Sequence, residues 1–128
     1  MEITESDVSL YEAARRSAAH AYAPYSGLAV GAALRTGGGA VFCGVNVENA
    51  SYGLTICAER NAVFAAVASG SREFSAIAIH GDAASLPPCG SCRQVLAEFA
   101  PELRVIWRRD GAPVASSLSD LLPERFRL

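Results

Sequence analysis

The sequence predicts an α/β protein with three layers, in which helices cover both faces of a five-stranded mixed sheet. Its 128 residues suffice for one domain, 1–128, with a full hydrophobic core. Three adjacent glycines at 37–39 separate two β-prone runs and indicate a hairpin. Beyond the hairpin, helical and β-prone segments alternate, which is the pattern of strands joined by helices that pack on the sheet.

The first half of the chain should contain one helix and the hairpin. Ser6 or Asp7 is a suitable N-cap for a helix that Pro24 closes, and its apolar residues recur at i, i+3 and i+4 to form one buried stripe. In the hairpin, residues 28–36 should pair with residues 40–47.

The second half should contain two helices and the remaining strands. Gly70 is placed to end the first of these helices, prolines at 87 and 88 precede the second, and Ser119 is the expected cap of a final turn. The elements are, in order, a helix at 57–69, a strand at 74–80, a helix at 90–99, strands at 103–107 and 114–116, and a turn at 120–122.

The composition is apolar and sparing in charge. Apolar residues make up 51% of the chain and charged residues 19%, against about 25% in an average soluble domain. A surface with so few charges favours buried subunit contacts, although a compact alanine-rich monomer would have a similar composition. The net charge is -2, and the 11 basic residues, all arginine, form no run of four, which argues against a nucleic-acid partner.

The sequence also favours a cytoplasmic protein without a membrane partner. Six charged residues within the first twenty argue against a secretory signal, and no apolar stretch reaches membrane-spanning length. In a reducing compartment, clustered thiols bind metal or take part in catalysis more often than they form disulfides. The four cysteines are therefore not expected to form two bridges.

Three of these cysteines lie where two helices should begin. Cys57 opens one helix, and Cys89 and Cys92 lie at i and i+3 on the first turn of the other. If the strands that precede these helices lie side by side, the two N-termini converge, and their dipoles favour thiolates. Because catalytic zinc keeps three protein ligands and an open position, the cluster predicts a catalytic zinc site.

Cys43 leaves a second interpretation open. As a fourth thiolate it would close the centre into a structural zinc site. It lies within a predicted strand, however, and a lone strand cysteine usually behaves as a small buried hydrophobe.

Charged residues beside the cysteines suggest how such a site would work. Three thiolates give zinc a formal charge of 2 - 3 = -1, and hydrogen bonds from Arg60 and Arg93 to the sulfurs would offset that charge. Glu59 lies two residues after Cys57, so it should point away from the metal and act as a proton carrier rather than a ligand.

Three blocks in this order carry a family resemblance: Asn46–Gly53 (NVENASYG), Cys57–Arg60 (CAER) and Pro88–Gln94 (PCGSCRQ). Together they resemble the small homotetrameric cytidine deaminases that bind zinc through three cysteines. The resemblance extends from about Tyr22 to Phe126. A C-x-x-C pair alone would be weak evidence, whereas three ordered blocks at these separations are specific.

The resemblance implies the cytidine deaminase-like fold and the hydrolytic deamination of cytidine and 2'-deoxycytidine, with release of ammonia, in pyrimidine salvage. It implies that an activated water attacks C4 of the pyrimidine while Glu59 moves the protons. Asn46 and Glu48 would bind the ribose 3'-hydroxyl, and the Ala58 backbone amide would contact the pyrimidine O2. One Zn²⁺ per subunit would be held by Cys57, Cys89 and Cys92.

The resemblance also implies a homotetramer in which subunits complete one another's pockets. Phe126 occupies the position of an aromatic residue that reaches a neighbour's site, with packing on its own core as the alternative. The chain departs from the family at Leu28 and Ala29, where Phe and Pro are usual. Without that aromatic face against the base, cytidine should bind more weakly, or a bulkier N4 group should be tolerated.

Two other functions use parts of the same pattern. A deaminase of tRNA or single-stranded DNA needs a basic binding path and often has histidine in place of Cys57, and this sequence has neither. A zinc fold used only for interactions would not need Glu59 beside Cys57. The sequence therefore favours a pyrimidine nucleoside as substrate.

Overall fold

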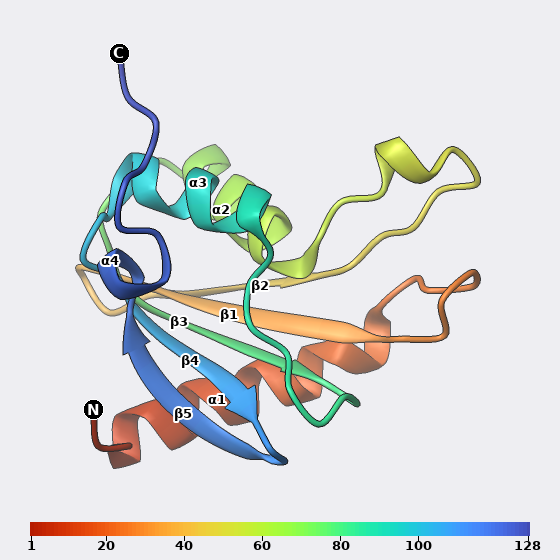
Figure 1. The fold of residues 1–128 in the computed structure, drawn as a ribbon, viewed down its shortest axis with the longest axis horizontal. Coiled ribbons are helices and arrows are strands. Elements are labelled where there is room, and N and C mark those ends of the chain that lie inside the picture. The colour runs from red at the N-terminus through yellow and green to blue at the C-terminus, as the bar shows by residue number, and fades with distance from the viewer.

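The structure is a computed structural model that describes residues 1–128 (Figure 1). The main elements are α1 (Glu5–Ser17), β1 (Val30–Thr36), β2 (Val41–Val45), α2 (Ala58–Ala68), β3 (Phe74–Gly81), α3 (Gly90–Phe99), β4 (Arg104–Arg109), β5 (Ala112–Ser117) and α4 (Leu118–Leu121). Short 3₁₀ turns at Ala18–His20 and Tyr52–Leu54 complete the order.

All strands belong to one sheet with the order β2-β1-β3-β4-β5. β3 and β4 run parallel, and the other neighbouring strands run antiparallel. Figure 1 shows α1 on one face of the sheet and α2 and α3 on the other. The predicted three-layer fold with a five-stranded mixed sheet is therefore confirmed.

The sequence places the wrong cap at two helix starts. Thr4, not Ser6 or Asp7, is the N-cap of α1, because Asp7 forms a capping box with it: Thr4 Oγ1 accepts from Asp7 N at 3.1 Å, and the Asp7 carboxylate accepts from Thr4 N at 2.9 Å. Ser117, not Ser119, is the N-cap residue of α4, because the helix already begins at Leu118. The Ser119 hydroxyl donates to the Glu102 carboxylate at 2.8 Å.

The face covered by α1 is packed mainly with small residues. Leu10, Tyr11 and Ala14 of α1 lie against alanines of β1, β3 and β5 and against Ile106. Gly31 lets α1 approach β1 closely, because a Cβ there would lie 2.1 Å from the Ala14 carbonyl oxygen.

Polar contacts also fasten α1 to the sheet. Arg104 of β4 donates from Nη2 and Nε to the buried carboxylate of Asp7 at 2.6 and 2.9 Å. Tyr11 Oη lies 2.7 Å from His80 Nδ1. Burial raises the pKa of Tyr11 and lowers that of His80, so both side chains favour their neutral forms.

The opposite face carries the larger core, with 15 buried residues. Branched side chains of the central strands pack there against α2 and α3, and Trp107 donates its indole N–H to Ser116 Oγ at 3.0 Å. Gly44 of β2 admits α2, because a Cβ there would lie 2.3 Å from Ala62 N and 2.4 Å from the Ala58 carbonyl oxygen.

Residues 21–29 and 46–57 form a projection from one end of the sheet, which we call the arm; it lies at the right of Figure 1. A bridge between Tyr22 and Val47 joins its two segments. Tyr25 and Tyr52 stack edge to face at 5.9 Å, and both are half exposed or more. The arm is thus held together by local contacts while its aromatic side chains remain open to other molecules.

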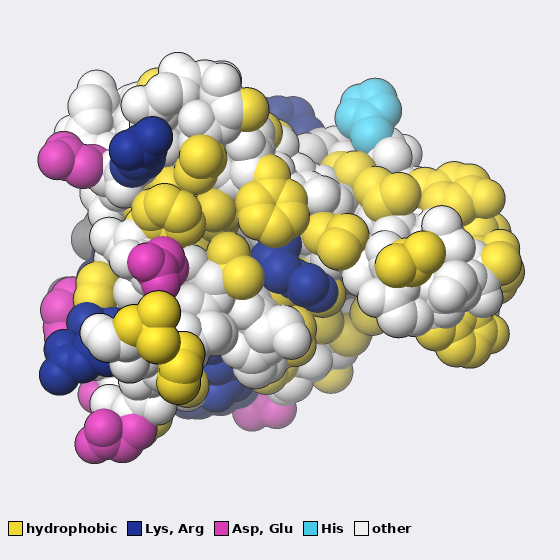
Figure 2. Space-filling model, turned by 90° about the horizontal axis from the view of Figure 1, so that it is seen from above, with side chains coloured by type: hydrophobic (Ala, Val, Ile, Leu, Met, Phe, Trp, Pro, Cys, Tyr) yellow, Lys and Arg dark blue, Asp and Glu magenta, His cyan; other side chains and the backbone are white.

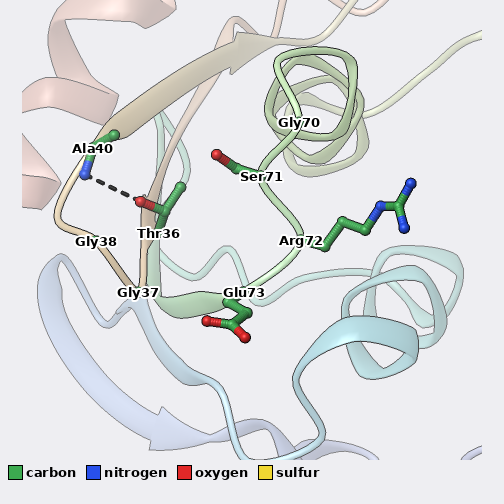
Figure 3. Close-up of a pocket in the computed structure, with 8 residues that line it drawn as sticks. All are labelled: Thr36, Gly37, Gly38, Ala40, Gly70, Ser71, Arg72 and Glu73. Carbon is green, nitrogen blue, oxygen red and sulfur yellow. Dashed lines mark hydrogen bonds between the residues drawn. The ribbon is translucent and has the colours of Figure 1, made fainter.

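The far end of β1 carries a hollow without catalytic candidates. It is lined by glycines and polar residues around Thr36, and Figure 3 shows the side chain of Arg72 pointing away from Thr36 and that of Glu73 lying near Gly37. None of the helices has the length and apolar character required to cross a lipid bilayer.

Candidate metal centre and active site

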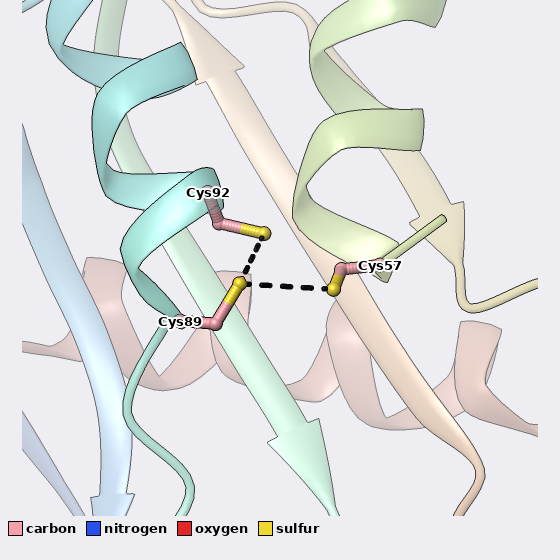
Figure 4. A group of neighbouring side chains, drawn as sticks. All are labelled: Cys57, Cys89 and Cys92. Carbon is pink, nitrogen blue, oxygen red and sulfur yellow. Dashed lines mark hydrogen bonds between the residues drawn. The ribbon is translucent and has the colours of Figure 1, made fainter. Parts of the chain in front are cut away.

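Cys57 and Cys89 are the N-cap residues of α2 and α3, and Cys92 lies on the first turn of α3. Both N-caps have extended backbone, and neither side chain makes a capping hydrogen bond. Their thiols therefore stay free for another ligand. Figure 4 shows the three sulfurs meeting between the two helix starts, as the sequence predicted.

The distances suit a zinc ion. Tetrahedral zinc with Zn–S bonds of about 2.3 Å holds its sulfurs about 3.8 Å apart. Cys89 Sγ lies 3.8 Å from Cys57 Sγ and 3.5 Å from Cys92 Sγ, and all three lie within 4.8 Å of one another. The residues present fit the metal without rearrangement of the backbone.

The route by which the helices converge differs from the predicted one. The strands before α2 and α3 are β2 and β3, and β1 lies between them in the sheet. The helix starts meet because the arm and the loop at 82–89 bring the chain back over β1. Convergence therefore depends on two long connections and not on neighbouring strands.

Cys43 is not part of the cluster. It pairs with Ala33, whose side chain packs against α1, so Cys43 faces the other side of the sheet. The cluster accordingly offers three sulfurs and not four.

The site favours a thiolate at Cys57. The nearby Cys92 thiol, assisted by Arg60, lowers the pKa of Cys57 to about 5, and the same pairing, together with burial, raises the pKa of Cys92. Arg60 Nη2 donates to Cys57 Sγ at 3.3 Å, and the Arg60 pKa is raised by that contact. Negative charge on sulfur is therefore stabilised within the protein.

The structure gives Arg93 a different set of contacts from those expected. It donates from Nε to the Pro88 carbonyl at 2.8 Å and from Nη1 to the Leu121 carbonyl at 2.6 Å, and to no sulfur. Its guanidinium is occupied by backbone oxygens on both sides of α3. Arg93 thus holds the loop that precedes Cys89 and links this loop to α4.

Glu59 lies on the first turn of α2 and is 5% exposed. Burial raises the pKa of its carboxyl group, with the Cys57 charge adding to this effect. A carboxyl group whose pKa is shifted toward neutrality can both accept and return a proton.

A cavity of about 210 Å³ opens beside the cysteines. Val30, Ile79 and Leu86 supply apolar walls, and the cavity contains no aromatic side chain. Six of the predicted site residues line it: Leu28, Asn46, Cys57, Ala58, Glu59 and Cys89. Because Ala58 is the first residue of α2, its N–H has no acceptor within the helix and remains available to a ligand.

Two predicted sugar-binding residues also hold the arm. Asn46 accepts from Val30 N and donates to the Leu28 carbonyl, both at 2.8 Å, and retains one donor and one acceptor site. The Glu48 carboxylate accepts from Tyr25 N at 2.9 Å and from the N–H and hydroxyl of Ser26. Glu48 lines a neighbouring hollow that shares Thr55 with the cavity.

Phe126 lies outside this cavity, on the C-terminal tail, and is 70% exposed. Packing on its own core is therefore not observed. The sequence also left Leu86, Pro87 and Thr55 unassigned, although all three line the cavity. For Leu86 and Pro87 the only available signal was their position just before Cys89.

Known proteins are similar to this chain in sequence and in structure. The family model described as "Cytidine and deoxycytidylate deaminase zinc-binding region" matches residues 4–107. A cytidine deaminase of Halalkalibacterium halodurans is 48% identical over 109 residues, which are 83% of each chain. A probable cytidine deaminase of Dictyostelium discoideum is 45% identical over 117 residues, 90% of this chain and 80% of that protein. The crystal structure of cytidine deaminase from Burkholderia pseudomallei superposes with a TM-score of 0.89 at 50% identity, covering 97% of this chain and all of that one.

Proposed function

The chain belongs to the family of zinc-dependent cytidine and deoxycytidylate deaminases, and we propose that it converts cytidine and 2'-deoxycytidine to uridine and 2'-deoxyuridine with release of ammonia. The observation that carries this proposal is the meeting of three thiols and the buried Glu59 at one apolar cavity. In this reaction water and an aminopyrimidine give ammonia and a pyrimidinone. Such a conversion suits a role in pyrimidine salvage.

Cys57, Cys89 and Cys92 would hold one zinc ion. Bound there, zinc supplies a Lewis acid that makes water nucleophilic at neutral pH. Negative charge on the thiolates weakens the activation of water by zinc. The hydrogen bond from Arg60 to Cys57 Sγ offsets part of that charge.

Glu59 moves the protons. A carboxylate oxygen of Glu59 takes one proton from the attacking water and passes it to N3 of the pyrimidine as the C4–O bond forms. Glu59 then takes the remaining proton from the new C4 hydroxyl and gives it to the amino group, which leaves as ammonia as the C4–N bond breaks and C4=O forms. Burial raises the pKa of Glu59, so its carboxyl group holds a proton more readily than an exposed glutamate and is better able to carry it to the substrate. The Ala58 N–H is suited to hold the pyrimidine O2 and thereby to orient C4.

Asn46 and Glu48 would select a nucleoside over a free base. The unused donor and acceptor of Asn46 can bind the 3'-hydroxyl of the sugar, and Glu48 has one lone-pair site left after its three contacts with the arm. Free cytosine would leave these groups unpaired and should be a poor substrate. Equal turnover of cytosine and cytidine would contradict this role.

The active form would be a homotetramer in the cytoplasm, with pockets completed by neighbouring subunits. Exposed aromatic residues on the arm and the tail, such as Tyr52 and Phe126, support shared contacts between copies. Figure 2 shows hydrophobic side chains over the face formed by α2, α3 and the tail and along the arm. The cavity has no aromatic wall of its own, and a neighbour's Phe126 would supply one.

The test is the loss of absorbance as cytidine becomes uridine, measured for the parent and for Glu59→Gln. The variant should lose about 10²- to 10⁴-fold in kcat while retaining zinc, because only the proton carrier is removed. Glu98→Gln, at an exposed glutamate of α3, is the matched control and should keep parental activity. An active Glu59→Gln enzyme would exclude the proposed mechanism.

A further inference from the structure

The segment after α4, which contains Phe126, is fastened to α3 at two points. Gln94 Nε2 donates to the Phe126 carbonyl at 2.9 Å, and Phe126 N donates to Gln94 Oε1 at 3.0 Å. Arg93, its neighbour on α3, holds the Leu121 carbonyl at the other end of the tail. One side-chain amide therefore binds both polar groups of a single residue 32 positions away.

The two hydrogen bonds of the Gln94 amide, which we call the clamp, fix the backbone of Phe126 and leave its side chain in solvent. Chain ends are usually poorly ordered unless something ties them down. Here the paired hydrogen bonds fix the direction in which the Phe126 side chain leaves the molecule, yet its residue is 70% exposed. An aromatic side chain held in this way loses less conformational freedom when a partner covers it.

We propose that Gln94 is a positioning residue that presents Phe126 to the substrate cavity of a second copy of the chain. The proposal rests on the proposed function, in which neighbouring subunits complete the pocket. The receiving cavity is open and apolar and lacks an aromatic side chain, so it offers a pyrimidine no aromatic face of its own. Gln94 supplies that face indirectly, by fixing where Phe126 can reach.

The arrangement also places the tail and the metal site on one helix. Gln94 lies two residues after Cys92 on α3, so the segment that positions two sulfurs also positions the aromatic residue offered to the neighbour. A displacement of α3 in one subunit would therefore alter both the cavity of that subunit and the neighbour's cavity that receives Phe126.

The experiment compares Gln94→Met, which keeps the length of the side chain but removes both hydrogen bonds, with Phe126→Ala and with the double variant. Glu98→Met on the same helix is the control and should retain the parental kcat and KM. Gln94→Met should raise KM for cytidine about fivefold, with a smaller effect on kcat, because a loosely held aromatic residue costs substrate binding more than chemistry. Since Gln94 acts through Phe126, the double variant should bind no worse than Phe126→Ala.

A second measurement does not depend on activity. Trypsin can cut after Arg125, next to the clamped residue, and Gln94→Met should speed this cleavage several-fold, as followed by mass spectrometry of the zinc-loaded assembly. Gln94→Glu keeps the acceptor for Phe126 N but loses the donor, so it should lie between the parent and Gln94→Met.

Unchanged KM and cleavage in Gln94→Met would overturn the proposal, as would effects of Gln94→Met and Phe126→Ala that multiply in the double variant. Failure of the proposed function is a separate result: the zinc-loaded parent would then release no ammonia from cytidine.

Discussion

The two faces of the sheet are built from opposite kinds of contact. On the face covered by α2 and α3, helix starts meet at a cavity and leave three thiols free of capping bonds. On the face covered by α1, polar side chains pair with one another: the Asp7 carboxylate caps α1 and pairs with Arg104, and Tyr11 contacts His80. The difference suggests that the α1 face stabilises the fold while the α2 and α3 face performs the chemistry.

A matched pair of glycines gives the strongest test of that division. Gly31 admits α1, and Gly44 admits α2. Replacing either by Ala forces a helix away from the sheet and should cost about 3 kcal/mol in the free energy of unfolding. Gly44→Ala also displaces α2 at Ala58, beside Cys57, so kcat should fall about 100-fold and zinc content should drop.

Gly31→Ala should lower the melting temperature about as much as Gly44→Ala does. The Gly31→Ala protein that remains folded should, however, keep one zinc per chain and a near-parental kcat. Melting curves, metal analysis and initial rates on both variants make the comparison. Equal loss of zinc from the two variants would show that the faces are not independent.

Asp7→Asn tests the polar contacts of the α1 face. Arg104 is partly exposed and Asp7 is buried, so loss of the pair should cost about 2 kcal/mol, between the values for exposed and buried ion pairs. Hydrogen bonds from Arg104 hold the pKa of Asp7 below its usual range. The contribution of the pair is therefore complete above the unfolded pKa of about 3.9 and is lost as pH falls through the lower folded value.

The measurement is the difference in unfolding free energy between the parent and Asp7→Asn from pH 7 to pH 2. It should stay constant down to about pH 5 and shrink only in the acid range. A difference that shrank near neutrality instead would assign the effect to another group. Deamination at pH 7 should be unchanged in the variant.

Arg60→Gln tests the chemical face without removing a metal ligand. Loss of the hydrogen bond to Cys57 leaves more negative charge at the metal site, and kcat should fall about tenfold while zinc stays bound. Arg72→Gln, at an exposed arginine in the hollow at the other end of β1, is the control and should have no effect. Unchanged turnover in Arg60→Gln would remove this residue from the mechanism.

The parts of this molecule that sequence predicts well are the local ones. The starts of α2 and α3, and the spacing that puts Cys89 and Cys92 on one side of α3, follow from short motifs and helix geometry. The approach of Cys57 to these two residues depends on long connections instead. The partners of Arg93 and Asp7 could not be predicted in the same way, because Leu121 is 28 residues from Arg93 and Arg104 is 97 residues from Asp7. Such contacts depend on strand order, and the insertion of β1 between β2 and β3 has no local signal.

Leu28→Phe should have the smallest effect and would sharpen the comparison at the cavity itself. Leu28 lines a cavity that has no aromatic side chain, so Phe would add a stacking face for the base. A gain of about 1 kcal/mol corresponds to a roughly fivefold lower KM for cytidine. Phe would also fill space, so N4-methylcytidine should gain less than cytidine or lose affinity, and the ratio of the two KM values provides the internal control. An unchanged KM for cytidine would mean that Leu28 does not face the base, and the cavity wall would then have to be assigned to the arm or to a neighbouring subunit.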